Sequence, residues 1–159
     1  MNLIEKEEIL KAIKAEKFPK IGNLLMKALS LDKINELYRK NWEKNKLDFV
    51  DAVLNQLEVK TIIDEKHLAR LPKEGPFITI SNHPYGTIDG LILFKILGEQ
   101  RSDAKLMANF LLQKIEPLKN SIIPLNPFDK YKVNQSNFAG IKKGFKHLQN
   151  GHPLGIFPA

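Results

Sequence analysis

Short apolar runs alternate with helical stretches from residue 58 onward, and this alternation constrains the fold more than any other feature of the chain. Val59-Lys60-Thr61-Ile62-Ile63 alternates and is rich in β-branched residues, and Pro76-Phe77-Ile78-Thr79-Ile80 follows turn residues. Further strands are predicted at 104–107 and 121–125, and helices at 88–98, at a short stretch ending near Pro117, and at 135–149. Strands that alternate with helices favour a largely parallel sheet with helical cover, so the expected fold class is α/β.

The first third of the chain is predicted to be helical. Apolar residues recur at helical spacing over 21–29, 34–42 and 50–57, and an earlier helix is expected from Leu3 to before Pro19. Asp32 is the expected N-cap of the helix over 34–42. Each apolar stripe has the width that a globular helix buries, so core packing is favoured over membrane insertion. We therefore expect a helical N-terminal segment, 1–57, followed by an α/β domain, 58–159.

The last predicted strand lies in an apolar run from Leu154 to Ala159, where the printed sequence stops. A strand in such a sheet is normally followed by a turn and by elements that cover it. The expectation is therefore an α/β domain that is incomplete at its C-terminus, either a truncated domain or a fragment of a longer protein.

Composition excludes several classes of protein and of site. An apolar fraction of 43% over 159 residues argues against intrinsic disorder. Because there is no Cys, a disulfide framework, a thiolate zinc site, an iron–sulfur cluster and a cysteine nucleophile are all excluded. The remaining histidines, His67, His147 and His152, do not form a ligand spacing with His83, so no metal is expected.

No transmembrane helix and no signal peptide are expected. The longest apolar stretches, such as Leu91 to Phe94, are far shorter than the roughly 20 residues that span a bilayer. Acidic residues occupy the N-terminus, where a signal peptide would carry a basic region and an apolar core. The expected location is the cytoplasmic side of the cell membrane, as a peripheral protein.

The formal charge of +7 is concentrated in the last third of the chain. Residues 101–159 hold 9 basic and 3 acidic side chains, whereas 1–60 hold 12 and 10, and 61–100 hold 4 and 5. Such a local excess could attract phosphates, nucleic acid or an anionic lipid surface, and the alternative is a solvated Lys-rich surface. Nucleic acid is disfavoured, because 22 of the 25 cations are Lys and no aromatic residues interleave with a basic run.

The segment from Ser81 to Gly90 is dense in chemically functional residues. His83 follows a predicted strand, at the sheet edge where open α/β folds bind ligands. The bend through Pro84 and Gly86 can turn His83 toward Asp89, and a carboxylate on one imidazole nitrogen leaves the other free to accept a proton. The alternative is structural: His83 caps the helix and Asp89 favours its N-terminus.

Three parts of the sequence carry a family resemblance: Asn82-His83-Pro84 with Asp89-Gly90, the preceding Leu71-Pro72-Lys73-Glu74-Gly75-Pro76-Phe77-Ile78, and the later Phe157-Pro158. Together they resemble the phospholipid/glycerol acyltransferase superfamily, typified by lysophosphatidate acyltransferases. The resemblance covers about residues 58–159. It implies that His83 and Asp89 are the catalytic residues, and that His83 deprotonates an acceptor hydroxyl that attacks an acyl thioester. It also implies substrate-binding roles for the following residues: Asn82, Gly86, Thr87, Asn126, Phe157 and Pro158.

The chain departs from the family pattern in three places. Five residues separate His83 from Asp89, one more than usual, which resembles bacterial hemolysin-like or ornithine-lipid acyltransferase variants. The region of the second motif, 122–127, has no Arg for an acceptor phosphate. The last motif normally continues past Phe157-Pro158 into a Glu- or Gly-containing turn, and this chain ends at Ala159.

The activity that the resemblance implies is a 1-acylglycerol-3-phosphate O-acyltransferase-like step of phospholipid biosynthesis. The donor is acyl-CoA or acyl carrier protein as a co-substrate, with no other cofactor, and the acceptor is a lysophospholipid, glycerol phosphate or related lyso-lipid. Backbone N–H groups near Gly86 and Thr87 are candidate oxyanion donors. Ser81 lacks the Gly-x-Ser-x-Gly context of a covalent nucleophile, which favours direct attack by the acceptor.

Five lysines form the expected basic surface, toward CoA phosphates, an acidic carrier protein, an anionic headgroup or an anionic membrane. They are Lys130, Lys132, Lys142, Lys143 and Lys146. The alternative function is a non-catalytic lipid- or carrier-binding module that keeps part of the acyltransferase fold without turnover.

Overall fold

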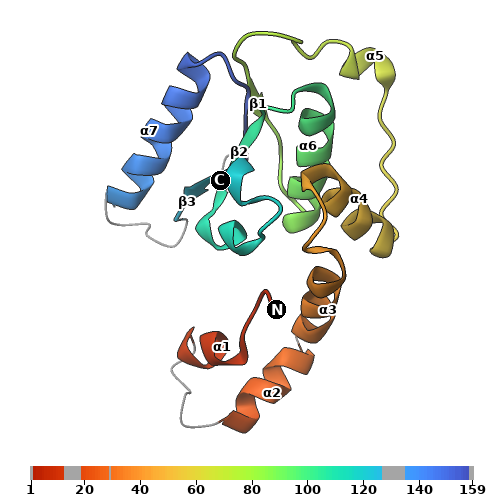
Figure 1. The fold of residues 1–159 in the computed structure, drawn as a ribbon, viewed down its shortest axis with the longest axis vertical. Helices are drawn as coiled ribbons and strands as arrows, with labels where there is room; N and C mark the ends of the chain where they lie inside the picture. Colours follow the sequence, from red (N-terminus) through yellow and green to blue (C-terminus); the bar gives the residue numbers. More distant parts are fainter. Residues whose placement is uncertain (1, 13–18, 29, 127–134, 158–159) are drawn as a thin grey trace. The chain divides into compact units, whose positions relative to one another are not determined.

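The computed structural model describes residues 2–12, 19–28, 30–126 and 135–157. Contacts between Cα atoms divide the chain into two compact units, Met1–Glu43 and Lys44–Ala159. Among the described residues, seven α-helices along the chain and one four-stranded parallel sheet confirm the predicted α/β fold class. Figure 1 follows the chain from the helices of the first unit to the sheet of the second.

Three helices make up the first unit: α1 (Lys6–Ala12), α2 (Pro19–Ala28) and α3 (Leu31–Asn41). The buried side chain of Asn35 ties α3 to the N-terminal segment. Its Oδ1 accepts from the N–H groups of Leu3 and Ile4 at 3.0 and 2.9 Å, and its Nδ2 donates to the carbonyl of Ile4 at 2.8 Å. A buried amide with all these groups paired fixes this segment against α3.

The prediction that Asp32 caps the third helix is wrong. Ser30 occupies the N-cap position, in a left-handed conformation and without a side-chain capping bond, and Asp32 lies inside the first turn. A carboxylate there still interacts favourably with the positive end of the helix dipole.

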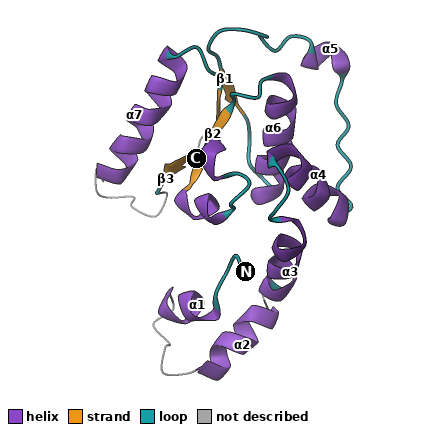
Figure 2. Cartoon of the chain, in the orientation of Figure 1, coloured by secondary structure: helices purple, strands orange, loops and turns teal. Residues whose placement is uncertain are grey.

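The second unit is built on a parallel sheet of four strands, drawn orange in Figure 2. They are β1 (Ile78–Ile80), β2 (Lys105–Asn109), β3 (Ile122–Leu125) and β4 (Leu154–Ile156), in the order β1-β4-β2-β3. Ile80 pairs with Ile156 and Asn109 with Leu125, so the carboxyl ends of all four strands meet at one edge. Ligands of open α/β sheets bind at this edge.

The prediction of a strand at residues 59–63 is wrong. These residues form an irregular connection between α4 (Lys46–Gln56) and α5 (Glu65–Leu68). Ile62 is 97% exposed. A β-branched composition forms a strand only where a neighbouring strand completes the hydrogen-bond ladder, and none of the described strands pairs with this segment.

Helices cover both faces of the sheet (Figure 1). On one face lies α6 (Thr87–Gln100), which packs against α4. A Cβ on Gly155 of β4 would lie 3.2 Å from Leu97 of α6, so this glycine permits close approach of helix and sheet. On the other face lies α7 (Gln135–Gln149), which contacts β3 and β4.

The helix α7 packs against the sheet through two glycines. A Cβ on Gly140 would lie 2.4 Å from the carbonyl oxygen of Pro124, and one on Gly144 would lie 3.3 Å from Leu154. Phe138 and Phe145, which recur with Ile141 at the spacing of an amphipathic helix, are 66% and 63% exposed. The glycines therefore bring the helix close to the sheet and leave its phenylalanines outside.

Two short 3₁₀ helices, η1 (Phe110–Lys114) and η2 (Lys119–Ser121), connect β2 to β3. The first, η1, stands where a short helix ending near Pro117 is predicted, and η2 follows that point. Within the described ranges, no helix combines the length and the apolar character needed to cross a bilayer.

Candidate active site

The imidazole of His83 lies at the carboxyl edge of the sheet, in the loop between β1 and α6. Phe157 directly follows β4, the strand that pairs with β1, so the two side chains leave neighbouring strands. Their rings stack with centroids 4.3 Å apart and an interplanar angle of 28°. The parallel pairing of β1 and β4 thus places Phe157 against one face of the His83 ring.

Asp89 lies in the first turn of α6 and is directed at the same loop. Its Oδ2 accepts from the backbone N–H of Tyr85 at 2.7 Å and lies 3.6 Å from Nδ1 of His83. The second distance is too long for a direct hydrogen bond. Gly86, with φ of 62°, forms the bend before α6 and accommodates the five residues between His83 and Asp89.

This geometry distinguishes the two nitrogens of His83. Nδ1 faces the carboxylate of Asp89, so Nε2 is the nitrogen available to a substrate. The His83 side chain is 40% exposed, whereas that of Asp89 is 18% exposed. The imidazole is therefore accessible, and the carboxylate beside it accepts a hydrogen bond from the backbone of Tyr85.

An apolar cavity of about 490 Å³ adjoins His83. His83, Thr87 and Asn109 are the polar residues that line it, together with Gly86, Gly90 and Phe157. The rest of the lining comes from α6, β2, β3 and the η1–η2 connection: Leu91, Phe94, Leu106, Met107, Ala108, Leu111, Leu112, Ile115, Leu118, Ile122 and Leu125. A cavity of this size and composition suits an elongated apolar ligand with a polar reacting end.

The structure brings only some of the predicted site residues together. His83, Gly86, Thr87 and Phe157 line the cavity, and Asp89 lies behind His83. Asn82 is exposed and does not line it. Pro158, Lys130 and Lys132 lie outside the described residues.

Asn126 is engaged with the start of α7. Its backbone N–H donates to Oδ1 of Asn137 at 2.6 Å, and its carbonyl accepts from Nδ2 of Asn137 at 2.9 Å. The neighbouring Leu125 lines the cavity, whereas Asn126 does not. Lys142, Lys143 and Lys146 are on α7, a helix that contributes no residue to the cavity.

Asn109 is a cavity residue that the sequence analysis did not identify. Its Oδ1 accepts from the N–H of Leu111 at 3.0 Å and so caps η1. The available signal was its position, because a polar residue at the carboxyl end of a parallel strand lies at the ligand-binding edge.

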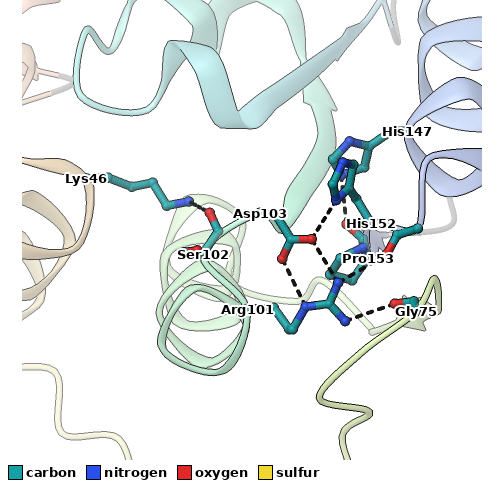
Figure 3. A network of polar contacts seen from close by, with 9 residues as sticks. Lys46, Gly75, Arg101, Ser102, Asp103, His147, His152 and Pro153 are labelled. Carbon is teal, nitrogen blue, oxygen red and sulfur yellow. Dashed lines mark hydrogen bonds and ion pairs between the residues drawn. The ribbon is translucent and has the colours of Figure 1, made fainter.

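A second polar cluster lies at the opposite edge of the sheet and is shown in Figure 3. Arg101 donates to Asp103 through Nε at 3.0 Å and Nη2 at 2.8 Å, and Nδ1 of His152 lies 2.6 Å from the same carboxylate. The Arg101 guanidinium, with a smaller contribution from His152, holds the pKa of Asp103 well below its ordinary value. Burial lowers the pKa of the neighbouring His147.

These histidines precede β4, far along the strands from His83, so the cluster is structural and not part of the cavity. Among the described residues, no group of three His, Cys, Asp or Glu side chains is arranged to hold a metal ion.

Comparison with known proteins extends this description. A family model described as Acyltransferase matches residues 12–159. A lyso-glycine lipid O-acyltransferase of Bacteroides thetaiotaomicron is 34% identical over 162 aligned residues, which cover 99% of this chain and 57% of that protein. A protein of the same name from Phocaeicola vulgatus is 31% identical over 129 aligned residues, which cover 78% of this chain and 46% of that protein. The chain thus spans about half the length of these curated relatives, and no solved structure gives a significant match.

Proposed function

The chain belongs to the acyltransferase family, and on that premise we propose that it transfers a fatty acyl group from a thioester to a hydroxyl of a lyso-lipid. The observation that carries the proposal is the His83–Asp89 pair at the edge of a large apolar cavity. A base next to an apolar cavity is what the transfer of an acyl chain requires, because the reacting carbonyl is polar and the rest of the chain is not.

In the proposed reaction, Nε2 of His83 removes the proton from the acceptor hydroxyl as its oxygen attacks the thioester carbonyl. The C–S bond then breaks, the thiolate leaves, and the proton held by His83 passes to the departing sulfur. Asp89 stabilises the imidazolium that exists between these two proton transfers. The 3.6 Å separation of Nδ1 and Oδ2 is expected to shorten when substrate orders the loop, since such contacts often tighten only in the complex.

The start of α6 is the proposed site for the developing negative charge on the carbonyl oxygen. The first N–H groups of a helix have no partner within the helix, and its dipole is positive at this end. Gly86 and Thr87 line the cavity at this terminus, next to His83. Their backbone N–H groups are therefore the proposed oxyanion donors.

The apolar lining is the proposed site for the acyl chain of the donor. Burial of each methylene stabilises binding by about 0.8 kcal/mol, so a cavity lined by leucine and isoleucine side chains can hold a long chain firmly. The donor is proposed to be acyl-CoA or acyl carrier protein, with no additional cofactor.

The acceptor is proposed to be a lyso-lipid of the kind named in the curated relatives, a lyso-glycine lipid. No Lys or Arg is among the described residues that line the cavity. Arg101 is engaged with Asp103 at the other edge of the sheet. Among the described residues, the cavity lining therefore offers no cationic side chain to an acceptor phosphate.

Replacement of His83 tests the proposal. We expect His83→Ala to lower the rate of acyl transfer from an acyl thioester to a lyso-lipid by about 10²–10⁴-fold, because the general base is lost. Asp89→Asn is expected to lower it less, since the imidazole remains. Product formation is measured by mass spectrometry, and folding by circular dichroism and thermal unfolding.

His67→Ala is the matched control, because His67 is an exposed histidine on α5 that does not line the cavity. It should retain the full rate. Equal rates for His83→Ala and the unmodified chain, or no transfer by the unmodified chain, would contradict the proposal and favour a lipid- or carrier-binding module without turnover.

A further inference from the structure

An apolar stripe on α7 has no cover among the described residues. Phe138, Ile141 and Phe145 are 66%, 44% and 63% exposed. They share one side of the helix because they are spaced by three and four residues. The glycines Gly140 and Gly144 turn the adjacent side toward the sheet, so the stripe lies beside the packed face and not in it.

The stripe continues onto the edge strand of the sheet. Ile78 and Ile80 of β1 are 51% and 69% exposed. A groove of about 160 Å³ runs between β1 and α7, and apart from Gly144 every residue that lines it is apolar. Contiguous exposed apolar surface of this kind marks an interaction site.

Positive charge borders the stripe on α7. Each step of four residues advances about 40° beyond a full helical turn, so Lys142 and Lys146, four and eight residues after Phe138, lie progressively further round the helix beside the stripe, with Lys143 beyond them. All three lysines are exposed and form no ion pair among the described residues. Residues 135–157 contain no Asp or Glu, so nothing in this segment offsets the charge.

We propose that α7, together with Ile78 and Ile80, is a docking surface for an anionic lipid bilayer. An interfacial helix combines aromatic or aliphatic side chains on one side with lysines beside them. The phenylalanines would enter the boundary between headgroups and acyl chains, while the lysine stems reach the lipid phosphates. A bilayer satisfies both requirements with one surface, and needs no matching shape.

The position of α7 relative to the cavity supports this partner. The helix begins just beyond the carboxyl end of β3, and Asn137 in its first turn holds Asn126, the residue after that strand. Phe138 therefore lies at the carboxyl end of the sheet, beside β3, and His83 follows β1 at the same end of the strands. A bilayer on this surface would thus lie at the carboxyl end of the sheet, the end that carries His83.

Vesicle binding tests the proposal, and it is independent of acyl transfer. The unmodified chain should bind vesicles of phosphatidylcholine mixed with phosphatidylglycerol, and bind pure phosphatidylcholine much more weakly. Replacing Lys142, Lys143 and Lys146 together by Gln should weaken binding to the mixed vesicles by about fivefold per Lys, which corresponds to about 1 kcal/mol each. Phe138→Ser with Phe145→Ser should weaken it by at least about tenfold.

Matched controls remove the same groups elsewhere on the second unit. Lys44, Lys60 and Lys66 are exposed, so their joint replacement by Gln removes the same charge. Ile62→Ser removes an apolar side chain that is 97% exposed. Both controls should bind like the unmodified chain, and so should His83→Ala, which separates failure of this proposal from failure of the proposed reaction.

A tryptophan placed in the stripe reports insertion directly. Trp42 is the single Trp of the chain, so Trp42→Phe with Phe145→Trp gives one fluorophore on α7. Its emission should shift to shorter wavelength with mixed vesicles and be quenched by brominated lipids. The proposal is overturned by an unmodified chain that does not bind, by equal losses in the α7 and control lysine variants, or by lipid-free oligomers that Phe145→Ser disperses without any lipid binding.

Discussion

Gly90 is the single residue at which the cavity can be reshaped with least disturbance of its walls. It lies in α6, one residue after Asp89, and lines the cavity. A Cβ built on it would have no atom within 4 Å apart from its own helix. We expect Gly90→Leu to fill part of the cavity and to shift acyl transfer toward shorter donors, by about 0.8 kcal/mol for each methylene displaced.

Rates with a series of acyl thioesters of increasing length measure this effect. Gly90→Ala is the control, because a single methyl group should change the preferred length little. An unchanged length preference in Gly90→Leu, with the fold intact by circular dichroism, would show that the acyl chain binds elsewhere.

The proximity of His83 and Asp89 was predictable, because the local chain brings them together. His83 and Asp89 belong to one strand–loop–helix segment, and the bend at Gly86 brings them within 3.6 Å. The stacking of His83 on Phe157 was not predictable from spacing, because it depends on β1 pairing with a strand about 75 residues later in the chain. Asn109 was not predicted, since the assembled sheet is what places it on the same cavity as His83.

At the scale of elements, the contact between α7 and β3 depends on glycine. A Cβ on Gly140 would lie 2.4 Å from a backbone oxygen, that of Pro124, which cannot move without the strand. We therefore expect Gly140→Ala to lower the free energy of unfolding by about 1–3 kcal/mol, as overpacking does, despite the better helix propensity of Ala. Urea unfolding measures the change.

Gly90→Ala is the matched control for this prediction too, since it makes the same substitution inside a helix where the added methyl group meets open space. It should raise the free energy of unfolding by about 0.5–1 kcal/mol. A Gly140→Ala chain as stable as the control would mean that α7 does not pack this closely.

Hydrophobic periodicity predicted the order and type of most elements, but it did not always predict which face of a helix is buried. The stripe of Phe138, Ile141 and Phe145 has the helical spacing of a core face, yet Gly140 and Gly144 meet the sheet. Hydrophobic periodicity is read from the positions of apolar side chains, so it cannot predict a contact that glycines make because they have no side chain. The prediction of a strand at residues 59–63 was wrong for a different reason: a strand needs a neighbouring strand to pair with, and the sequence does not show whether one is present.

At the scale of the whole second unit, one polar cluster joins segments that are distant in sequence. Arg101 donates to the carbonyls of Gly75 at 2.9 Å and Gly151 at 3.1 Å while it pairs with Asp103, and Asp103 also contacts His152. The approach to β1, the end of α6 and the turn before β4 are thereby held together (Figure 3). Removal of one partner would leave the others unsatisfied in a partly buried site.

The stability of this unit should consequently depend on pH, with a sign set by two groups. Guanidinium pairing depresses the pKa of Asp103 below its ordinary 3.8, so the unfolded chain binds the proton first as pH falls. Its stabilising contribution is therefore present above about pH 3.8 and is lost as pH falls below that value. Burial likewise lowers the pKa of His147 below its ordinary 6.5, so a further loss begins as pH falls through 6.5.

We expect Asp103→Asn to lower the free energy of unfolding at neutral pH by about 1–3 kcal/mol and to flatten the decline below pH 3.8, because the titrating carboxyl is gone. The decline that begins near pH 6.5 should persist in this variant and weaken in His147→Gln. Urea unfolding at a series of pH values measures both declines in stability.

Asp32→Asn is the control, because it removes a carboxyl of the first unit, and it should leave both declines unchanged. If the free energy of unfolding of Asp103→Asn falls with pH in the same way as that of the unmodified chain does, protonation of Asp103 does not affect stability, and the prediction is wrong.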